Sequence, residues 1–224
     1  MAFQLKPDKI LVVGPQSREL VKTFAPELDV QYTPAFRYQW IFENAKAPKA
    51  GNELLVLLGY GLSSAVSTLR LLMNIQNDLK QFDRVLIKLH PAGYFDADRL
   101  LKEAQLRLPD HFEFIDGKLE KFLNRVGVGL CTATGTSVEL ILRGIPVVVM
   151  AEKYALTMNY MSGQEDPEIW RLCFSERQVK EALTAFKELS EKSFDKLSQK
   201  ALEFQRLYFA NPHEDYWKNY LFLP

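Results

Sequence analysis

Short apolar runs alternate with amphipathic stretches along most of the chain. Several runs end at glycine or proline, and most carry apolar side chains at successive positions, as strands buried on both faces do. Runs of this kind predict strands at 9–14, 28–33, 53–59, 84–89, 111–116, 126–131, 145–150 and 171–174.

The stretches between these runs repeat their apolar positions at helical spacing. In the stretch 63–82, for example, Val66, Leu69, Leu72 and Met73 fall on one face. The same pattern predicts helices at 17–25, 63–82, 96–106, 119–126, 136–142, 176–189 and 191–209. Strands that alternate with helices build a parallel sheet with helices on both faces, so we expect an α/β protein with a Rossmann-like sheet.

The predicted elements divide the chain into unequal parts. Residues 1–45 hold a single β-α-β segment, and residues 46–52, rich in Lys and Ala, read as a linker. The longer α/β series occupies 53–190, and residues 191–224 form C-terminal helices with an aromatic-rich tail. We expect 53–190 to be the ligand-binding domain, because it holds most of the sheet.

Composition and charge narrow the class of protein. Hydrophobic residues make up 47% of the 224 residues, enough for a substantial core. Lys and Arg number 28, as do Asp and Glu, so the net charge is zero and a dedicated nucleic-acid surface is not expected. Cys131 and Cys173 lie far apart and show no metal-binding spacing, so we interpret them as reduced core thiols of a cytosolic protein.

Neither a membrane span nor a signal peptide is recognisable in the sequence. No apolar run approaches the roughly 18 residues that a span requires, and the N-terminus lacks a signal-peptide pattern. We therefore expect a cytoplasmic, soluble protein, and association with the inner face of the membrane stays open.

Glycine and serine follow the strand predicted at 53–59. Gly59 and Gly61 allow backbone N–H groups to turn outward, and Ser63 and Ser64 are expected to cap the next helix. A helix N-terminus preceded by glycines is suited to bind phosphate. An ordinary turn with a serine cap is the alternative, because the full G-x-G-x-x-G pattern is absent.

A histidine and a proline follow the strand predicted at 84–89. His90 can donate a hydrogen bond or carry a proton near neutral pH, and Pro91 ends the strand. At the carboxyl end of a strand, such a histidine can face a phosphate or a leaving group. The alternative is a histidine that only bonds the local backbone.

The loop after the strand at 126–131 carries an unusual number of hydroxyl groups. Glu139 follows it in the first turn of a helix, where a carboxylate is favourable and can reach a ribose. We expect an anion that carries sugar hydroxyls to bind to this hydroxyl row, whose residues are Thr132, Thr134, Gly135, Thr136 and Ser137.

These motifs resemble a known family. K-L-H-P at 88–91, followed by T-A-T-G-T-S-V-E-L-I-L-R-G-I-P-V-V-V at 132–149, is similar to the C-terminal half of GT-B fold glycosyltransferases. The nearest in style are bacterial enzymes of surface polysaccharide synthesis, such as polysialyltransferases, with their H-P dipeptide. The segment Glu139 to Val147 is similar to the E-A-x-x-x-G-x-P-V segment of the class, with Leu140 in place of Ala.

The resemblance implies a donor site. His90 would contact the donor phosphate as the catalytic residue, Glu139 would hold the ribose, and Arg143 and Gly144 would close the helix. GT-B enzymes work without a metal-binding D-x-D motif, so neither a metal nor another cofactor is expected. The donor-binding residues implied are Gly59, Gly61, Ser63, His90, Pro91, Thr132, Thr134, Gly135, Thr136, Ser137 and Glu139.

The expected function is therefore donor binding in a glycosyltransferase. A sugar would move from a CMP-, CDP- or UDP-linked donor to an acceptor hydroxyl of a saccharide, in surface polysaccharide synthesis. One β-α-β segment before residue 53 is too little for the acceptor half, so we expect a fragment or a partner chain, and activity of this chain alone stays undecided. The alternatives are a UDP-sugar 2-epimerase-like enzyme, which the presence of only three histidines disfavours, and a non-catalytic nucleotide-binding or assembly module.

Overall fold

The computed structural model describes residues 7–43, 51–132, 134–151, 161 and 166–211. The chain forms two compact units, one made of residues 1–45 and 201–224 and the other of residues 46–200. We call them unit 1 and unit 2. Most of the predicted linker and the aromatic residues of the predicted tail (Tyr216, Trp217, Tyr220 and Phe222) lie outside the described residues.

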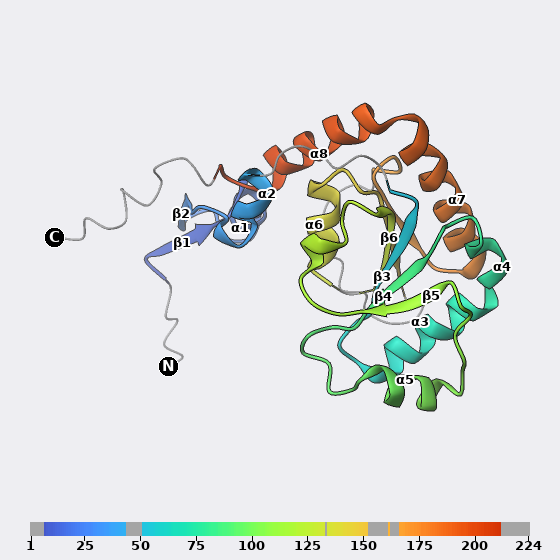
Figure 1. Ribbon diagram of the computed structural model, residues 1–224. Coiled ribbons are helices and arrows are strands. Elements are labelled where there is room, and N and C mark those ends of the chain that lie inside the picture. Colours follow the sequence, from blue (N-terminus) through green and yellow to red (C-terminus); the bar gives the residue numbers. More distant parts are fainter. Residues whose placement is uncertain (1–6, 44–50, 133, 152–160, 162–165, 212–224) are drawn as a thin grey trace. The chain divides into compact units, whose positions relative to one another are not determined.

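Unit 2 is built on a six-stranded parallel sheet (Figure 1). Its strands are β3 (Glu53–Leu57), β4 (Val85–Lys88), β5 (Phe112–Ile115), β6 (Val126–Cys131), β7 (Val147–Met150) and β8 (Trp170–Cys173). Their order in the sheet is β5-β4-β3-β6-β7-β8. The chain starts at β3 in the middle and adds β4 and β5 on one side. It then returns to the other side of β3 and adds β6, β7 and β8. This arrangement is the Rossmann order, and it confirms the predicted fold class.

Helices cover both faces of this sheet. Helices α3 (Leu62–Asn74), α5 (Ala97–Ala104) and α7 (Glu176–Lys192) share one apolar core with the side chains of one face. Helix α6 (Thr136–Leu142) packs on β6 and β7, and Figure 1 shows it on the side opposite α7. Every residue of β3 and β6 is buried, which explains why these runs are almost wholly apolar.

Two glycines fit helix α6 between its strands. A Cβ at Gly129 in β6 would lie 2.5 Å from Cδ1 of Leu140, so glycine lets the helix approach the sheet. At the other end, Gly144 adopts a φ of 73°, and its N–H donates to the carbonyl of Ile141 over 2.8 Å. This ending confirms that Arg143 and Gly144 close the helix.

Two predicted helix caps are wrong. Helix α1 (Pro15–Phe24) begins at Pro15 and not after Ser17, because proline is well suited to the first helical position. Helix α3 begins after Gly61, so Ser63 lies inside its first turn and makes no capping hydrogen bond. In both cases an extended glycine occupies the position before the helix.

Two predicted helices differ in extent. The helix expected at 63–82 breaks at Ile75 into α3 and α4 (Gln76–Leu79), and the bend keeps Ile75 buried in the core. The helix expected at 119–126 is only the single turn η2 (Leu119–Lys121), and turns at 122–125 lead from it into β6.

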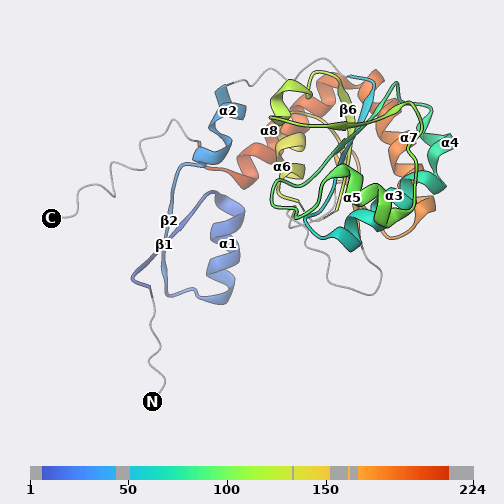
Figure 2. The same ribbon diagram turned by 60° about the horizontal axis from the view of Figure 1, so that its bottom comes forward.

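Unit 1 contains a small parallel sheet. Strands β1 (Lys9–Val12) and β2 (Asp29–Tyr32) pair in parallel, and α1 lies alongside them (Figure 2). The turn η1 (Phe36–Tyr38) and helix α2 (Gln39–Glu43) follow, in a stretch for which the sequence predicted no helix. A Cβ at Gly14 would lie 2.0 Å from the carbonyl oxygen of Tyr208, so the end of α8 (Phe194–Tyr208) packs closely on the β1–α1 turn.

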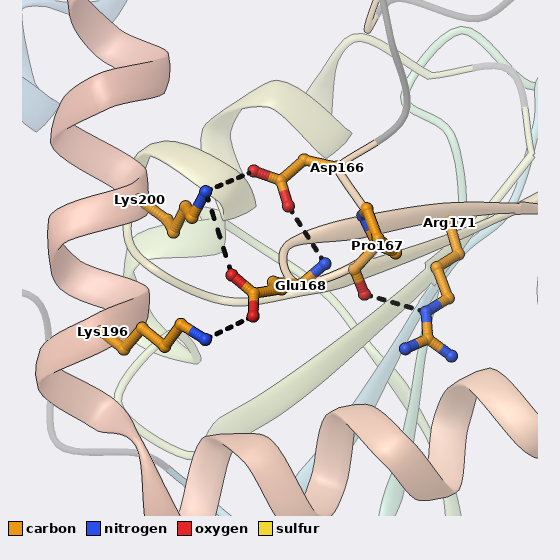
Figure 3. Close-up of polar contacts among 6 residues, drawn as sticks. All are labelled: Asp166, Pro167, Glu168, Arg171, Lys196 and Lys200. Carbon is orange, nitrogen blue, oxygen red and sulfur yellow. Dashed lines mark hydrogen bonds and ion pairs between the residues drawn. The ribbon is translucent and has the colours of Figure 1, made fainter.

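Charged side chains hold the first turns of α8 within unit 2. Lys200 contacts Asp166 at 3.0 Å and Glu168 at 3.9 Å, and Lys196 pairs with Glu168 (Figure 3). The N–H of Glu168 also donates to the Asp166 carboxylate over 3.1 Å. This cluster links the segment before β8 to the helix that follows α7.

Candidate functional site

Three loops leave the sheet of unit 2 side by side. Leu57, at the end of β3, is in register with Lys88 of β4 on one side and Cys131 of β6 on the other. The chain therefore leaves these strands at neighbouring points of one edge. Because β3 and β6 are adjacent but lead to helices on opposite faces, this edge is the switch point at which Rossmann-like sheets bind ligands.

The loops after β3 and β6 touch at Gly59 and Thr132. A Cβ at Gly59 would lie only 3.0 Å from Oγ1 of Thr132, so glycine permits this approach. Oγ1 of Thr132 is buried and has no hydrogen-bond partner in the described part of the chain. A buried hydroxyl without a partner is costly, and a ligand or water that bonds it would remove that cost.

His90 lies beside the same loop. Its Nδ1 accepts a hydrogen bond from the N–H of Ala92 over 3.1 Å, so the neutral imidazole carries its hydrogen on Nε2. Within the described ranges Nε2 makes no hydrogen bond. The ring of Tyr60 meets the imidazole edge to face, with 6.2 Å between centroids. One ring nitrogen of His90 thus bonds the local backbone, as expected of a histidine with a purely structural role. The other nitrogen is available to donate a hydrogen bond to a ligand.

Two members of the hydroxyl row face into their own loop. Thr134 and Ser137 are only 5% and 2% exposed. The Ser137 hydroxyl donates to the carbonyl of Thr134 over 2.6 Å, and Oγ1 of Thr134 accepts from the N–H of Thr136 over 3.3 Å. The expectation that every hydroxyl of the row lines a ligand site is therefore not met. These two shape the loop, because a buried hydroxyl takes the nearest backbone partner.

The remaining predicted residues at this edge differ in exposure. Ser63 and Pro91 are exposed, whereas the others are half-buried, namely Gly61, Gly135, Thr136 and Glu139. Gly135 and Thr136 lie at the start of α6, and Glu139 is in its first turn, as expected. On the other side, Gly61 precedes α3, and apart from its two chain neighbours no described residue has an atom within 4 Å of the position that a Cβ there would take. The described residues around position 61 therefore leave room for a side chain.

Burial changes the titration of two groups near α6. It raises the pKa of the Cys131 thiol to about 12, although a hydrogen bond with Ser137 opposes the rise. Burial also lowers the pKa of Arg143 at the end of the helix. Both cysteines are free and buried, as predicted. The Cys131 thiol therefore stays protonated and has a structural role rather than that of a nucleophile.

Tyr60 is the residue at this edge that sequence reasoning missed. Its position between two glycines at the end of a buried strand was the available signal, but its contact with His90 depends on the strand order. Among the described residues, no group of three or more His, Cys, Asp or Glu side chains is placed to hold a metal ion. Nor does any helix in the described ranges have the length and apolar character to cross a membrane.

Comparisons with solved structures identify the fold. The chain is similar to the GtfA/B complex, with a TM-score of 0.59 and 13% identity over 96% of this chain and 45% of that one. It is also similar to WaaG, a glycosyltransferase involved in lipopolysaccharide biosynthesis (TM-score 0.51, 15% identity, 92% of this chain and 61% of that one). The wall teichoic acid polymerase TagF matches with a TM-score of 0.51 and 14% identity over 96% of this chain and 56% of that one.

These structural neighbours are GT-B glycosyltransferases, so the chain has a fold found in that class. At 13–15% identity the likeness is one of fold, and the chain spans 45–61% of the length of these structures. No protein-family model matches the sequence, and no curated protein matches it.

Proposed function

We propose that unit 2 binds a nucleotide-activated sugar at the edge formed by the ends of β3, β4 and β6, as the donor-binding part of a glycosyltransferase. One observation carries the proposal. At the switch point of the sheet, the Thr132 hydroxyl, which no described residue bonds, lies beside Gly59. Tyr60 follows Gly59 in the same loop, and its ring contacts His90. A hydroxyl, an imidazole and the start of a helix thus meet where such sheets bind phosphates.

Each group has a role in this proposal. The N–H groups in the first turn of α3, which no side chain caps, face the donor phosphate together with the Thr132 hydroxyl and Nε2–H of His90. Gly61 leaves room for the phosphate, and Ser63 offers a further hydroxyl. On the β6 side, Thr136 and the backbone at Gly135 contact the phosphate, and Glu139 bonds the ribose. Thr134 and Ser137 contribute by holding the loop, and Pro91 by ending the β4 segment.

The reaction would place negative charge on the departing phosphate. The bond between the anomeric carbon and the phosphate oxygen breaks, and the acceptor hydroxyl oxygen forms the new bond to that carbon. Nε2–H of His90 and the backbone N–H groups stabilise the phosphate as charge develops on it. The acceptor proton passes to a base on the acceptor side.

The activity of the whole protein also belongs to this proposal. The acceptor half would come from residues beyond this chain or from a partner chain, since the chain covers about half of the GT-B structures it matches. A CMP-, CDP- or UDP-linked donor and a saccharide acceptor of surface polysaccharide follow from the sequence resemblance. WaaG, a glycosyltransferase involved in lipopolysaccharide biosynthesis, and TagF, a wall teichoic acid polymerase, support that direction. From the same resemblance, the enzyme would be of the polysialyltransferase-like type and would act at the inner face of the membrane.

Thermal unfolding of the chain with CMP, CDP, UDP or GDP tests the donor site. A nucleotide at about 100 times its Kd stabilises the fold by about 2.7 kcal/mol, and we expect this with one of the pyrimidine nucleotides. Thr132→Val removes only the unpartnered hydroxyl, so its stability without ligand should match or exceed that of the native chain, while the nucleotide shift falls. Gly61→Ala fills open space and should likewise fold normally but lose the shift.

Thr184→Val on α7 is the matched control for the threonine change. Its side chain is exposed on a helix that the proposal does not use, so the nucleotide shift should be unchanged. No shift with any nucleotide, or an undiminished shift in both Thr132→Val and Gly61→Ala, would contradict the proposed site.

A further inference from the structure

Tyr60 is an aromatic residue with no evident structural task. Its side chain is 59% exposed, and it does not belong to the apolar core of unit 2. Its ring contacts the imidazole of His90, and it makes no hydrogen bond within the described part of the chain. Packing therefore does not explain why this position holds a large aromatic ring.

The loop that carries Tyr60 is held on one side and open on the other. Gly59 lies against Thr132, so this end of the loop is fixed by the neighbouring loop. Beyond Tyr60, no described residue other than the chain neighbours of Gly61 has an atom within 4 Å of a Cβ position there. The tyrosine ring thus stands on an anchored loop, next to His90 and beside open space.

The proposed donor orientation decides what would reach this ring. Glu139 on α6 marks the ribose end, and His90 marks the phosphate. The group attached beyond the phosphate then lies on the side of β3 and β4, where Tyr60 is exposed. A pyranose ring has an apolar face of C–H groups, and aromatic rings offer such faces a flat, weakly polar contact.

We propose that Tyr60 is the stacking platform for the ring of the transferred sugar and so helps to determine which donor is accepted. This inference rests on the proposed function. It adds a contact with the transferred group that the phosphate and ribose residues do not make. A residue of this kind discriminates between donors without affecting the affinity for the nucleotide itself.

The test compares free nucleotides with their sugar conjugates on the full chain. Kd is measured calorimetrically for UDP and UDP-glucose, CMP and CMP-N-acetylneuraminate, and CDP and CDP-glycerol, whose transferred group has no ring. In Tyr60→Ala we expect Kd for the free nucleotide to stay within about twofold, and Kd for the ring-bearing conjugate to rise about 3- to 10-fold. Tyr60→Phe keeps the ring and should bind as the native chain does.

Tyr94→Ala is the matched control. It removes another exposed tyrosine, 91% exposed, from the neighbouring loop, and it should change neither Kd. Equal weakening of nucleotide and conjugate in Tyr60→Ala would overturn the proposal, because the ring would then contact the base or phosphate. No weakening of either would also overturn it.

The two proposals fail in different ways. If the native chain binds none of these nucleotides or conjugates, the donor site itself is wrong, and the role of Tyr60 falls with it. If the native chain binds these ligands and Tyr60→Ala still prefers the conjugate to the free nucleotide as the native chain does, only the stacking role is wrong.

Discussion

Residues with the same functional group differ in role at this edge because of burial and local bonding. Thr132 and Thr134 are two positions apart, yet the hydroxyl of the first has no partner among the described residues and that of the second bonds its own loop. The nearby residues decide the difference: Gly59, from the loop after β3, lies against Thr132, and the start of α6 supplies an N–H to Thr134. Residue type alone does not separate them.

The buried thiol of Cys131 makes stability depend on pH. Its pKa rises from the ordinary 9.0 to about 12, so between these values the unfolded chain releases a proton that the folded chain retains. Stability is therefore lost as pH rises through that range. Compared with Cys131→Ala in urea unfolding, the advantage of the native chain should shrink by about 1.4 kcal/mol between about pH 8 and pH 10.

Val149→Ala controls for the loss of packing near Cys131. Val149 pairs with Cys131 in the sheet, is buried and does not titrate, so its cost should be the same at both pH values. A pH-independent difference for Cys131→Ala would show that the thiol does not resist ionisation in the folded chain.

Elements end and bend where tertiary contacts outweigh local preference. The helical pattern continues past Ile75, but a bend there keeps Ile75 and Leu79 in the core. At the start of α8, charged contacts add to apolar packing: Leu197 is buried, and Lys196 and Lys200 contact Asp166 and Glu168. The attachment of the first turns of α8 to the segment before β8 should therefore depend on ionic strength.

A double-mutant cycle measures this attachment. Asp166→Asn and Lys200→Gln remove a contact of 3.0 Å between side chains 33% and 28% exposed. At this exposure the coupling free energy of unfolding should be about 0.5–1 kcal/mol at low salt, and it should fall sharply in about 1 M NaCl. The control is the more exposed i,i+4 pair Arg177–Glu181 on α7, whose coupling should be smaller. Coupling that is absent at low salt, or unchanged by salt, would contradict a charge-based attachment.

At the scale of the whole molecule, the two units differ in how much they bury. All residues of β3 and β6 in unit 2 are buried, whereas β1 and β2 in unit 1 each have one buried residue. Leu20 and Phe24, on α1, are among the large apolar side chains that stay exposed. A sheet of two strands is marginal by itself, so the two units should differ in local stability.

Hydrogen exchange read by mass spectrometry tests this difference. Backbone amides of β1 and β2 should exchange faster than those of β3 and β6, because local opening of unit 1 exposes less apolar surface. Equal protection in the two units would mean that unit 1 is stabilised by contacts beyond those of its own described residues.

The sequence by itself determined the type and order of the elements and the loops that carry polar chemistry. Continuous apolar runs such as 126–131 and the helix at 136–142 were predicted with the observed bounds, because periodicity and local turn residues are properties of neighbouring positions. The glycine closure at Gly144 was also predictable, since it depends on the residues of a single turn.

Only the tertiary structure decided which of these polar residues meet. The strand order places the loop of β3 between those of β4 and β6, and thereby brings Tyr60 to His90 and Gly59 to Thr132. It also decided that Ser137 faces inward and that the helix expected at 119–126 is only the single turn η2. These outcomes depend on contacts between residues far apart in the sequence, and no local pattern carries that information.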